Sequence, residues 1–207
     1  MRSVLMAVLC SFAIGAPSLS AQVGADTLGA DTAVYQVIVH FWHAHSGPGP
    51  RPMLVALATA PGWASPAGRA SLASLLRADS MRTGIRAEFL RRNATPANLR
   101  PDWGTPDIVH WLDQATLPSD ASDSAYAAGW SRVQEQYPDA AEIIQWSRPA
   151  FTATGDSALV ILEAIEPPPR GRAGCRTDAQ TYWLTKVDGK WQVAVIGYVS
   201  HYARTAW

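Results

Sequence analysis

Residues 182–195 read YWLTKVDGKWQVAV and contain the clearest local signal in the chain. Asp188-Gly189 is a two-residue turn of the kind that favours a tight β-hairpin, because both residues tolerate a positive φ. The register that follows joins three cross-strand pairs: Lys186 with Trp191, Leu184 with Val193, and Tyr182 with Val195. Paired side chains share one face of a sheet, so we predict that this mostly apolar face, Trp191 included, covers the core.

The rest of the chain divides into a helical half and a sheet half. Apolar spacing predicts helices at residues 32–43, at 65–93 with a break near Ser80, at 107–114 and at 122–137. A β-branched run at 37–39 leaves a strand open as an alternative to the first helix. Alternation predicts strands at about 142–151, 156–166, 179–187 and 190–200, with a short buried strand at 53–59. The expected fold class is α+β, with N-terminal helices followed by an antiparallel meander of about four strands.

The first 21 residues have the pattern of an export signal. Arg2 precedes an apolar run at 4–14, and small residues at 18–21 offer a cleavage site. That run is shorter than the roughly 20 residues needed to span a bilayer core. We therefore expect residues 1–21 to be a signal peptide, 22–31 a flexible lead-in, and 32–207 a single α+β domain without a membrane span after cleavage. An uncleaved N-terminal anchor is the alternative.

Charge and cysteine content restrict the classes of partner and the compartment. The chain has 17 basic and 17 acidic residues and a formal net charge of zero. Nucleic-acid binders need a surplus of Lys and Arg to neutralise phosphates, so we expect no nucleic-acid partner. Cys10 lies in the predicted signal, which leaves Cys175 as a lone thiol, and we expect it to be buried. The predicted location is the periplasm or the cell exterior.

The sequence contains no nucleophile elbow, phosphate-binding loop, H-E-x-x-H or C-x-x-C motif. Its candidate metal ligands are His40, His43 and His45, of which the first two lie on one face of the predicted helix. Imidazoles in such a cluster would select zinc or copper. The alternative is that these histidines lie at the edge of an amphipathic helix beside a loop and bind no cofactor.

Four residues are candidates for acid–base chemistry. His110 and Asp113 are three residues apart on the predicted helix at 107–114, where they either share a hydrogen bond that tunes a general base or form an ordinary surface pair. His201 lies near the end of the predicted sheet. Glu163 interrupts an apolar strand, where we expect solvent exposure at a sheet edge, with a buried carboxyl of raised pKa as the alternative.

Several short groups of residues stand out together in the C-terminal third: Ser147-Arg148 with Phe151, Ala158-Leu159-Val160, Cys175, Leu184-x-Lys186, Gly189-Lys190-Trp191-x-Val193 and Tyr198-Val199-Ser200. Further positions lie upstream: Glu88-Phe89 with Asn93, Leu99, and Trp130 ahead of Tyr137-Pro138. Together they resemble an uncharacterised family of secreted bacterial α+β proteins. The chain departs from that family at Ala150, where Gly is usual, at Tyr198, where Trp is usual, and in lacking a second cysteine before Cys175. The resemblance implies export and an α+β fold, and it transfers no catalytic residue.

The last predicted hairpin is also similar to that of the cone-shaped nuclear-transport-factor-like superfamily, whose curved sheets surround a pocket and serve both enzymes and binding modules. Taken together, these observations predict an exported envelope protein that binds an unidentified envelope protein or a small molecule without catalysis. The alternative is a small envelope enzyme, or a metal-binding protein that uses His40, His43 and His45.

Overall fold

The computed structural model describes residues 19–45, 52–59, 83–99, 107–118, 122–168 and 175–203. For residues 19–28, 83, 114, 175–178 and 198–203 the description is limited to the backbone. Most of the predicted signal peptide and the first part of the predicted helix at 65–93 lie outside the described residues, and so does the side chain of Cys175. No helix in the described part of the chain combines the length and the apolar character that crossing a membrane requires.

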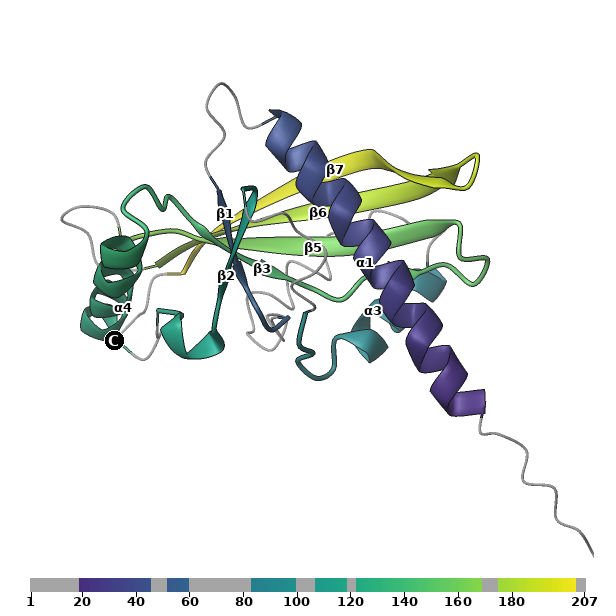
Figure 1. Ribbon diagram of the computed structural model, residues 1–207, viewed down its shortest axis with the longest axis horizontal. Helices are drawn as coiled ribbons and strands as arrows, with labels where there is room; N and C mark the ends of the chain where they lie inside the picture. Colours follow the sequence, from purple (N-terminus) through teal and green to yellow (C-terminus); the bar gives the residue numbers. More distant parts are fainter. Residues whose placement is uncertain are drawn as a thin grey trace, which may run out of the picture.

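The described elements follow one another in this order: α1 (Leu19–His45), β1 (Met53–Ala56), α3 (Thr83–Arg92), β2 (Val109–Leu112), the 3-10 turn η4 (Gln114–Thr116), α4 (Asp123–Gln136), β3 (Ile143–Trp146), β4 (Ala150–Phe151), β5 (Ser157–Ile165), β6 (Cys175–Val187) and β7 (Lys190–Ala203). The strands form one sheet in the order β2-β1-β3-β5-β6-β7, and β4 pairs with β5. Figure 1 shows α1 crossing the sheet obliquely, with α4 near the end where β1 and β2 lie.

The predicted antiparallel meander of about four strands is wrong, because the sheet has seven strands and is mixed. β1 pairs in parallel with both β2 and β3, whereas each neighbouring pair from β3 through β5 and β6 to β7 is antiparallel. β1 falls within the short buried strand predicted at 53–59, but β2 lies where the sequence predicts a helix at 107–114. β2 contains the β-branched Val109 and the aromatic Trp111. Both side-chain types suit a strand, and the strand forms here because it pairs with β1.

The helix α1 begins at Leu19, although the sequence predicts a flexible lead-in at 22–31 and a helix start at Asp31 or Thr32. Asp31 is not a cap but a buried side chain inside the helix. The strand alternative for residues 37–39 is wrong as well, since the helix continues to His45. Helical geometry is favoured there because it buries Ile38 and Val39 together on the side facing the sheet.

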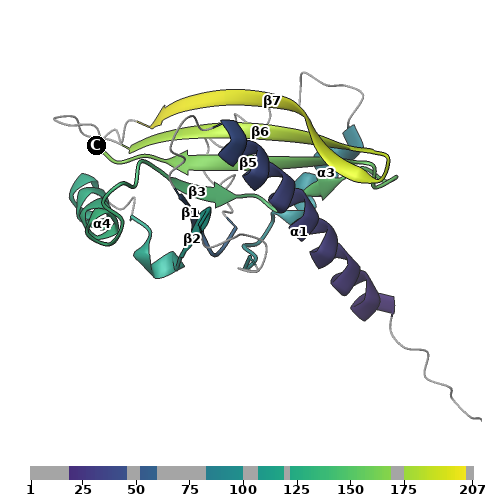
Figure 2. The ribbon, with the colours of Figure 1, turned by 45° about the horizontal axis from the view of Figure 1, so that its top comes forward.

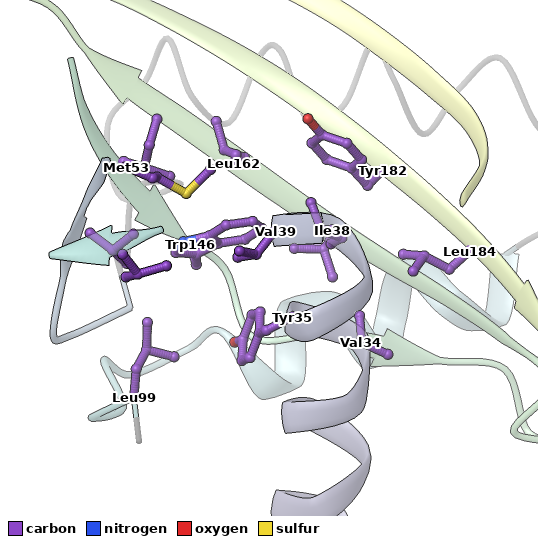
Figure 3. Close-up of a cluster of buried hydrophobic side chains, with 14 of the residues drawn as sticks. Val34, Tyr35, Ile38, Val39, Met53, Leu99, Trp146, Leu162, Tyr182 and Leu184 are labelled. Atoms are coloured by element: carbon purple, nitrogen blue, oxygen red, sulfur yellow. The ribbon is translucent and has the colours of Figure 1, made fainter. Parts of the chain in front are cut away.

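The main core lies between α1 and one face of the sheet, which we call the α1 face (Figure 2). Figure 3 shows Tyr35 and Ile38 of α1 pointing toward side chains from β3, β5 and β6. The ring of Tyr35 stands edge-on to that of Trp146, with centroids 5.5 Å apart. Ile38 and Trp146 are fully buried, so α1 covers the centre of this face.

The opposite face of the sheet carries two smaller apolar clusters. Side chains alternate along a strand, and the residues that point away from α1 contact α3 at one end and α4 at the other. The α3 cluster consists of Ile85, Phe89, Ala150, Leu159, Ile161, Ala179 and Trp183. The α4 cluster consists of Leu54, Leu112, Tyr126, Trp130, Val133 and Ile143.

The predicted helix at 122–137 is confirmed as α4. Ser122 is its N-cap, and the Ser122 hydroxyl accepts a hydrogen bond from Ala125 N at 3.1 Å. The backbone of Gly129 lies against Pro118, so closely that a Cβ atom at Gly129 would stand 2.6 Å from the Pro118 Cα. Glycine is therefore required where this helix meets the segment before it.

The β6–β7 hairpin confirms the predicted turn and two of the three predicted pairs. Asp188 and Gly189 have φ angles of 50° and 76°, as a tight hairpin turn requires. Lys186 pairs with Trp191 and Leu184 with Val193. The Lys186 Nζ lies 4.7 Å from the centroid of the Trp191 ring, a cation–π contact.

The third predicted pair, Tyr182 with Val195, is wrong. The register shifts between Trp183 and Leu184, so that Tyr182 pairs with Ile196 and Trp183 with Val195. One extra residue in β7 makes a β-bulge, which transfers the residues beyond it to the opposite face. Val195 consequently points away from α1 and is 58% exposed.

A buried ion pair joins α1 to α3. Arg92 Nη2 lies 2.9 Å from Asp31 Oδ1 and 3.0 Å from Oδ2, and the two side chains are 4% and 8% exposed. Arg148 Nη2 approaches the same carboxylate at 3.4 Å. Burial raises the pKa of Asp31 above its usual value, although both arginines act to lower it. Each charged side chain therefore depends on its contact with the other to offset the free-energy cost of losing its hydration.

Hydrogen bonds tie this ion pair to the segment between β3 and β4. The Asn93 amide donates to the carbonyl of Arg148 at 3.0 Å and accepts from the backbone N of Arg148 at 2.6 Å. Burial raises the pKa of Tyr35 well above its usual value, so its hydroxyl stays protonated and donates to Ser147 O at 3.0 Å. Ser147 Oγ in turn accepts from Ile161 N at 2.9 Å. α1, α3 and β5 are thus connected through buried polar contacts.

Replacing tryptophan by alanine should distinguish the core from its margin. Trp130 is 1% exposed, so Trp130→Ala should lower the free energy of unfolding by about 3–5 kcal/mol. Trp191 is only partly buried, beside Phe151 at a centroid distance of 5.9 Å, so Trp191→Ala should cost about 1–2 kcal/mol. Urea unfolding followed by circular dichroism measures both, and equal losses would contradict the marginal position of Trp191.

Asp31→Ala should lower the free energy of unfolding by about 3–5 kcal/mol, because it leaves the Arg92 guanidinium buried without its carboxylate. The double variant Asp31→Leu/Arg92→Met, which removes both charges, should recover much of that loss. A double-mutant cycle built from Asp31→Leu, Arg92→Met and their combination, followed by urea unfolding, measures the coupling. Arg91→Ala is the matched control, because Arg91 is 71% exposed in its pair with Glu88 and should leave stability nearly unchanged. A cost for Asp31→Ala as small as the control's would show that the buried pair is not structural.

Candidate functional site

The structure places His110 and Asp113 far from Glu163, at the other side of the sheet. His110 lies in β2, Asp113 follows it, Glu163 lies in β5 and His201 in β7. β1 and β3 stand between β2 and β5, and adjacent strands are about 4.8 Å apart, so roughly 14 Å of sheet separate the strands of His110 and Glu163. The side chain of His201 lies outside the description. Among the described side chains, no hydrogen bond joins any two of His110, Asp113 and Glu163.

The predicted pairing of His110 with Asp113 is wrong, because residues three apart in a strand-to-turn segment do not share the face that a helix would give them. The Asp113 carboxylate accepts a hydrogen bond from Ala115 N at 3.2 Å, and its carbonyl accepts from Thr116 Oγ1 at 2.7 Å. Asp113 therefore organises η4. The ring of His110 instead lies 5.4 Å from that of Tyr137.

His110 and Tyr137 belong to a half-open pocket of about 190 Å³. Its lining comes from the start of β1, from β2 and from the C-terminal end of α4: Pro52, Leu54, His110, Gln136, Tyr137, Pro138, Asp139 and Ala140. Tyr137 is the C-cap of α4, and its N–H donates to Val133 O at 2.7 Å. Pro138 cannot continue the helix, so the chain turns at this point and forms one wall of the pocket.

The pocket combines apolar walls with a few polar groups at its lining. Leu54, Pro52 and Pro138 supply the apolar surface, and the Gln136 amide donates to Tyr137 Oη at 3.2 Å. Whole drug-sized ligands occupy pockets of about 300–1,000 Å³. A cavity of about 190 Å³ therefore accepts a single ring or one protein side chain. The Asp139 carboxylate and the His110 imidazole are polar groups that can orient such a guest.

Glu163 lies in the middle of the sheet, and the predicted position at a sheet edge is wrong. Its neighbours in register are Gln145 of β3 and Ala179 of β6. It lies on the face opposite α1, between residues of the α3 cluster and of the α4 cluster. Its side chain is half-buried, and the loss of hydration raises the pKa of Glu163 to about 7, which favours the alternative of a carboxyl with a raised pKa over free exposure. Near neutral pH this group both donates and accepts hydrogen bonds, so it is a second candidate functional residue.

The three histidines at the end of α1 are not gathered into a metal site. His40 and His45 are exposed, and His45 lies about 140° around the helix from His40. His45 is the last residue of α1, although the predicted helix ends at residue 43, and its ring stacks on that of Phe41 with centroids 4.0 Å apart. The described residues contain no group of three or more His, Cys, Asp or Glu side chains placed to hold a metal ion.

Comparison of the chain with protein-family models, with curated proteins and with solved structures found no match. Several residues on which the expected resemblance to secreted α+β proteins rests lie together in space. Asn93 bonds Arg148, Ser147 bonds Tyr35, and the Arg92 guanidinium lies 5.2 Å from the centroid of the Phe151 ring. These residues surround the buried ion pair, so in this chain they support the fold.

Sequence reasoning missed Tyr137, Gln136 and Asp139 as pocket residues, because their contact with β2 arises only in the tertiary structure. It also missed the buried role of Asp31. A signal for Asp31 exists in the sequence, since it precedes Val34 and Tyr35 by three and four residues and so shares their buried side of the helix.

Glu163→Gln should change how stability depends on pH. The fold raises the pKa of this carboxyl from 4.5 to about 7, so it favours the protonated form. The resulting stabilisation is complete below pH 4.5 and is lost as the pH rises through 7. The loss amounts to about 3 kcal/mol.

Urea unfolding between pH 4.5 and 9 tests this prediction. Glutamine mimics the protonated acid, so the variant should match the wild-type protein at low pH and exceed it by about 3 kcal/mol at high pH. Glu135→Gln removes an exposed carboxylate from α4 and controls for the change in net charge. A stability difference that stays constant across the pH range would show that Glu163 is not buried in this way.

Proposed function

We propose that this chain is an exported envelope protein, periplasmic or secreted, that binds a small molecule or one side chain of an envelope partner and does not catalyse a reaction. The observation that carries the binding proposal is the half-open pocket of about 190 Å³ where His110 faces the ring of Tyr137. The leader-like pattern of residues 1–21 supports export.

The lining indicates the chemistry of the guest. Two rings and the side chains of Leu54 and Pro138 favour a flat apolar group. A carboxylate, that of Asp139, favours a guest that carries a hydrogen-bond donor or a positive charge. An amine attached to an aromatic ring through a methylene group, such as benzylamine, or a phenol combines these properties. A guest of this size is expected to bind with a Kd in the range of about 0.1–10 mM.

The dispersion of the predicted acid–base residues favours binding over the alternative of a small envelope enzyme. General acid–base catalysis needs the reacting groups within hydrogen-bond reach of one substrate. His110 and Glu163 are separated by two strands, and Asp113 is engaged in the η4 turn. The separation of His40 from His45 around α1 likewise gives no support to the metal-binding alternative.

Tyr137→Ala should weaken guest binding at least about tenfold, because it removes one aromatic wall of the pocket. Titration of the ¹⁵N-labelled protein with benzylamine and with phenol measures this by chemical-shift changes at the backbone amides of Gln136, Tyr137, Asp139, Ala140 and His110. Trp191→Ala, which removes an aromatic ring from the β6–β7 hairpin, is the matched control and should bind as the wild-type protein does. If neither probe shifts these signals in a saturable way, or if Tyr137→Ala binds normally, the pocket is not the binding site.

A further inference from the structure

His110 forms part of the wall against which a guest in the pocket must pack. Its partner in register is Leu54 of β1, and partners on neighbouring strands share one face of a sheet. Leu54 belongs to the α4 cluster, so the His110 side chain stands on the face opposite α1, at the end where α4 lies. Its ring is 5.4 Å from that of Tyr137, with 35° between the two planes.

The ionic groups of the lining come from two places in the fold. Asp139, in the segment after α4, brings a carboxylate, and His110 of β2 brings an imidazole. Histidine is the side chain that commonly gains or loses a positive charge between about pH 5 and 8. The other residues of the lining carry no carboxyl, amine or guanidinium group: Pro52, Leu54, Gln136, Tyr137, Pro138 and Ala140.

The small volume of the pocket brings a guest close to both ionic groups. A guest ring that packs on Tyr137 fills much of the 190 Å³. An ammonium group on that ring, paired with the Asp139 carboxylate, then shares this space with the His110 imidazole. Like charges at such short range repel each other strongly, because little water separates them. A protonated imidazole and a bound ammonium group therefore oppose each other.

We propose that His110 determines the charge selectivity of the pocket. With a neutral imidazole the pocket binds a cationic aromatic guest, and with a protonated imidazole it rejects the cation but still accepts a neutral ring. The imidazolium both repels the ammonium group and competes with it for the Asp139 carboxylate. A cationic guest is thus bound near pH 8 and released as the pH falls. This inference rests on the proposed binding function of the pocket.

Benzylamine and benzyl alcohol are matched probes for this selectivity, because they share a ring and a methylene group and differ in charge. Benzylamine, a primary alkylamine like the lysine side chain, stays protonated between pH 5.5 and 8. Titrations of the ¹⁵N-labelled protein should show at least about tenfold weaker benzylamine binding at pH 5.5 than at pH 8. The Kd for benzyl alcohol should change by less than about twofold.

His110→Asn removes the titrating ring and keeps a polar side chain. This variant should bind benzylamine equally well at both pH values, and it should still bind benzyl alcohol, which shows that the pocket keeps its shape. His40→Asn is the matched control, since it removes an exposed histidine of α1 that does not line the pocket. It should keep the pH dependence of the wild-type protein.

The protonation of the His110 ring, followed by NMR of its imidazole nitrogens, gives a second readout. Linkage is reciprocal, so saturating benzylamine should move the midpoint of this titration to lower pH, and benzyl alcohol should not. Equal benzylamine binding at both pH values, or a pH dependence that His110→Asn retains, would overturn the proposal and leave the binding function standing. If neither probe binds at either pH, the proposed function fails and this inference fails with it.

Discussion

The ion pair between Asp31 and Arg92 is the contact on which the arrangement of the helices depends. Two buried charges are tolerated only while they remain together, and here they belong to helices that cover opposite faces of the sheet. α1 and α3 therefore cannot shift independently. Through Arg148 and Asn93 the same contact fixes the segment between β3 and β4, so one polar cluster sets the relation between both helices and the centre of the sheet.

Elements whose determinants are local could be predicted from the sequence. The Asp188-Gly189 turn specifies its own hairpin, and the Ser122 cap specifies the start of α4. β2 could not be predicted in this way, because its partner strand begins at Met53, far back in the sequence, and four residues fit a helix or a strand equally well. The bulge in β7 is a single extra residue without a local signature, and it alone displaced the predicted partner of Tyr182.

The sequence singles out one residue of the pocket, His110, and the carboxyl of Glu163, but neither their geometry nor the other pocket residues. The sequence points to His110 and Glu163, because a histidine and a carboxylate stand out among apolar neighbours. Whether Glu163 meets water depends on the order of strands in the sheet, which local patterns do not contain. The partner of His110 likewise depends on where α4 ends relative to β2. That arrangement places Tyr137, and not Asp113, beside the His110 ring.

The position of β1 has a consequence for the order in which the molecule folds. Both of its neighbours, β2 and β3, come later in the chain, and the buried face of α1 packs largely against strands that come later still. During synthesis from the N-terminus, the residues of α1 and β1 are therefore made before most of the strands against which they pack. The hairpins from β4 to β7 have the more local contacts and can form first. The N-terminal half then completes a sheet that the C-terminal half has begun.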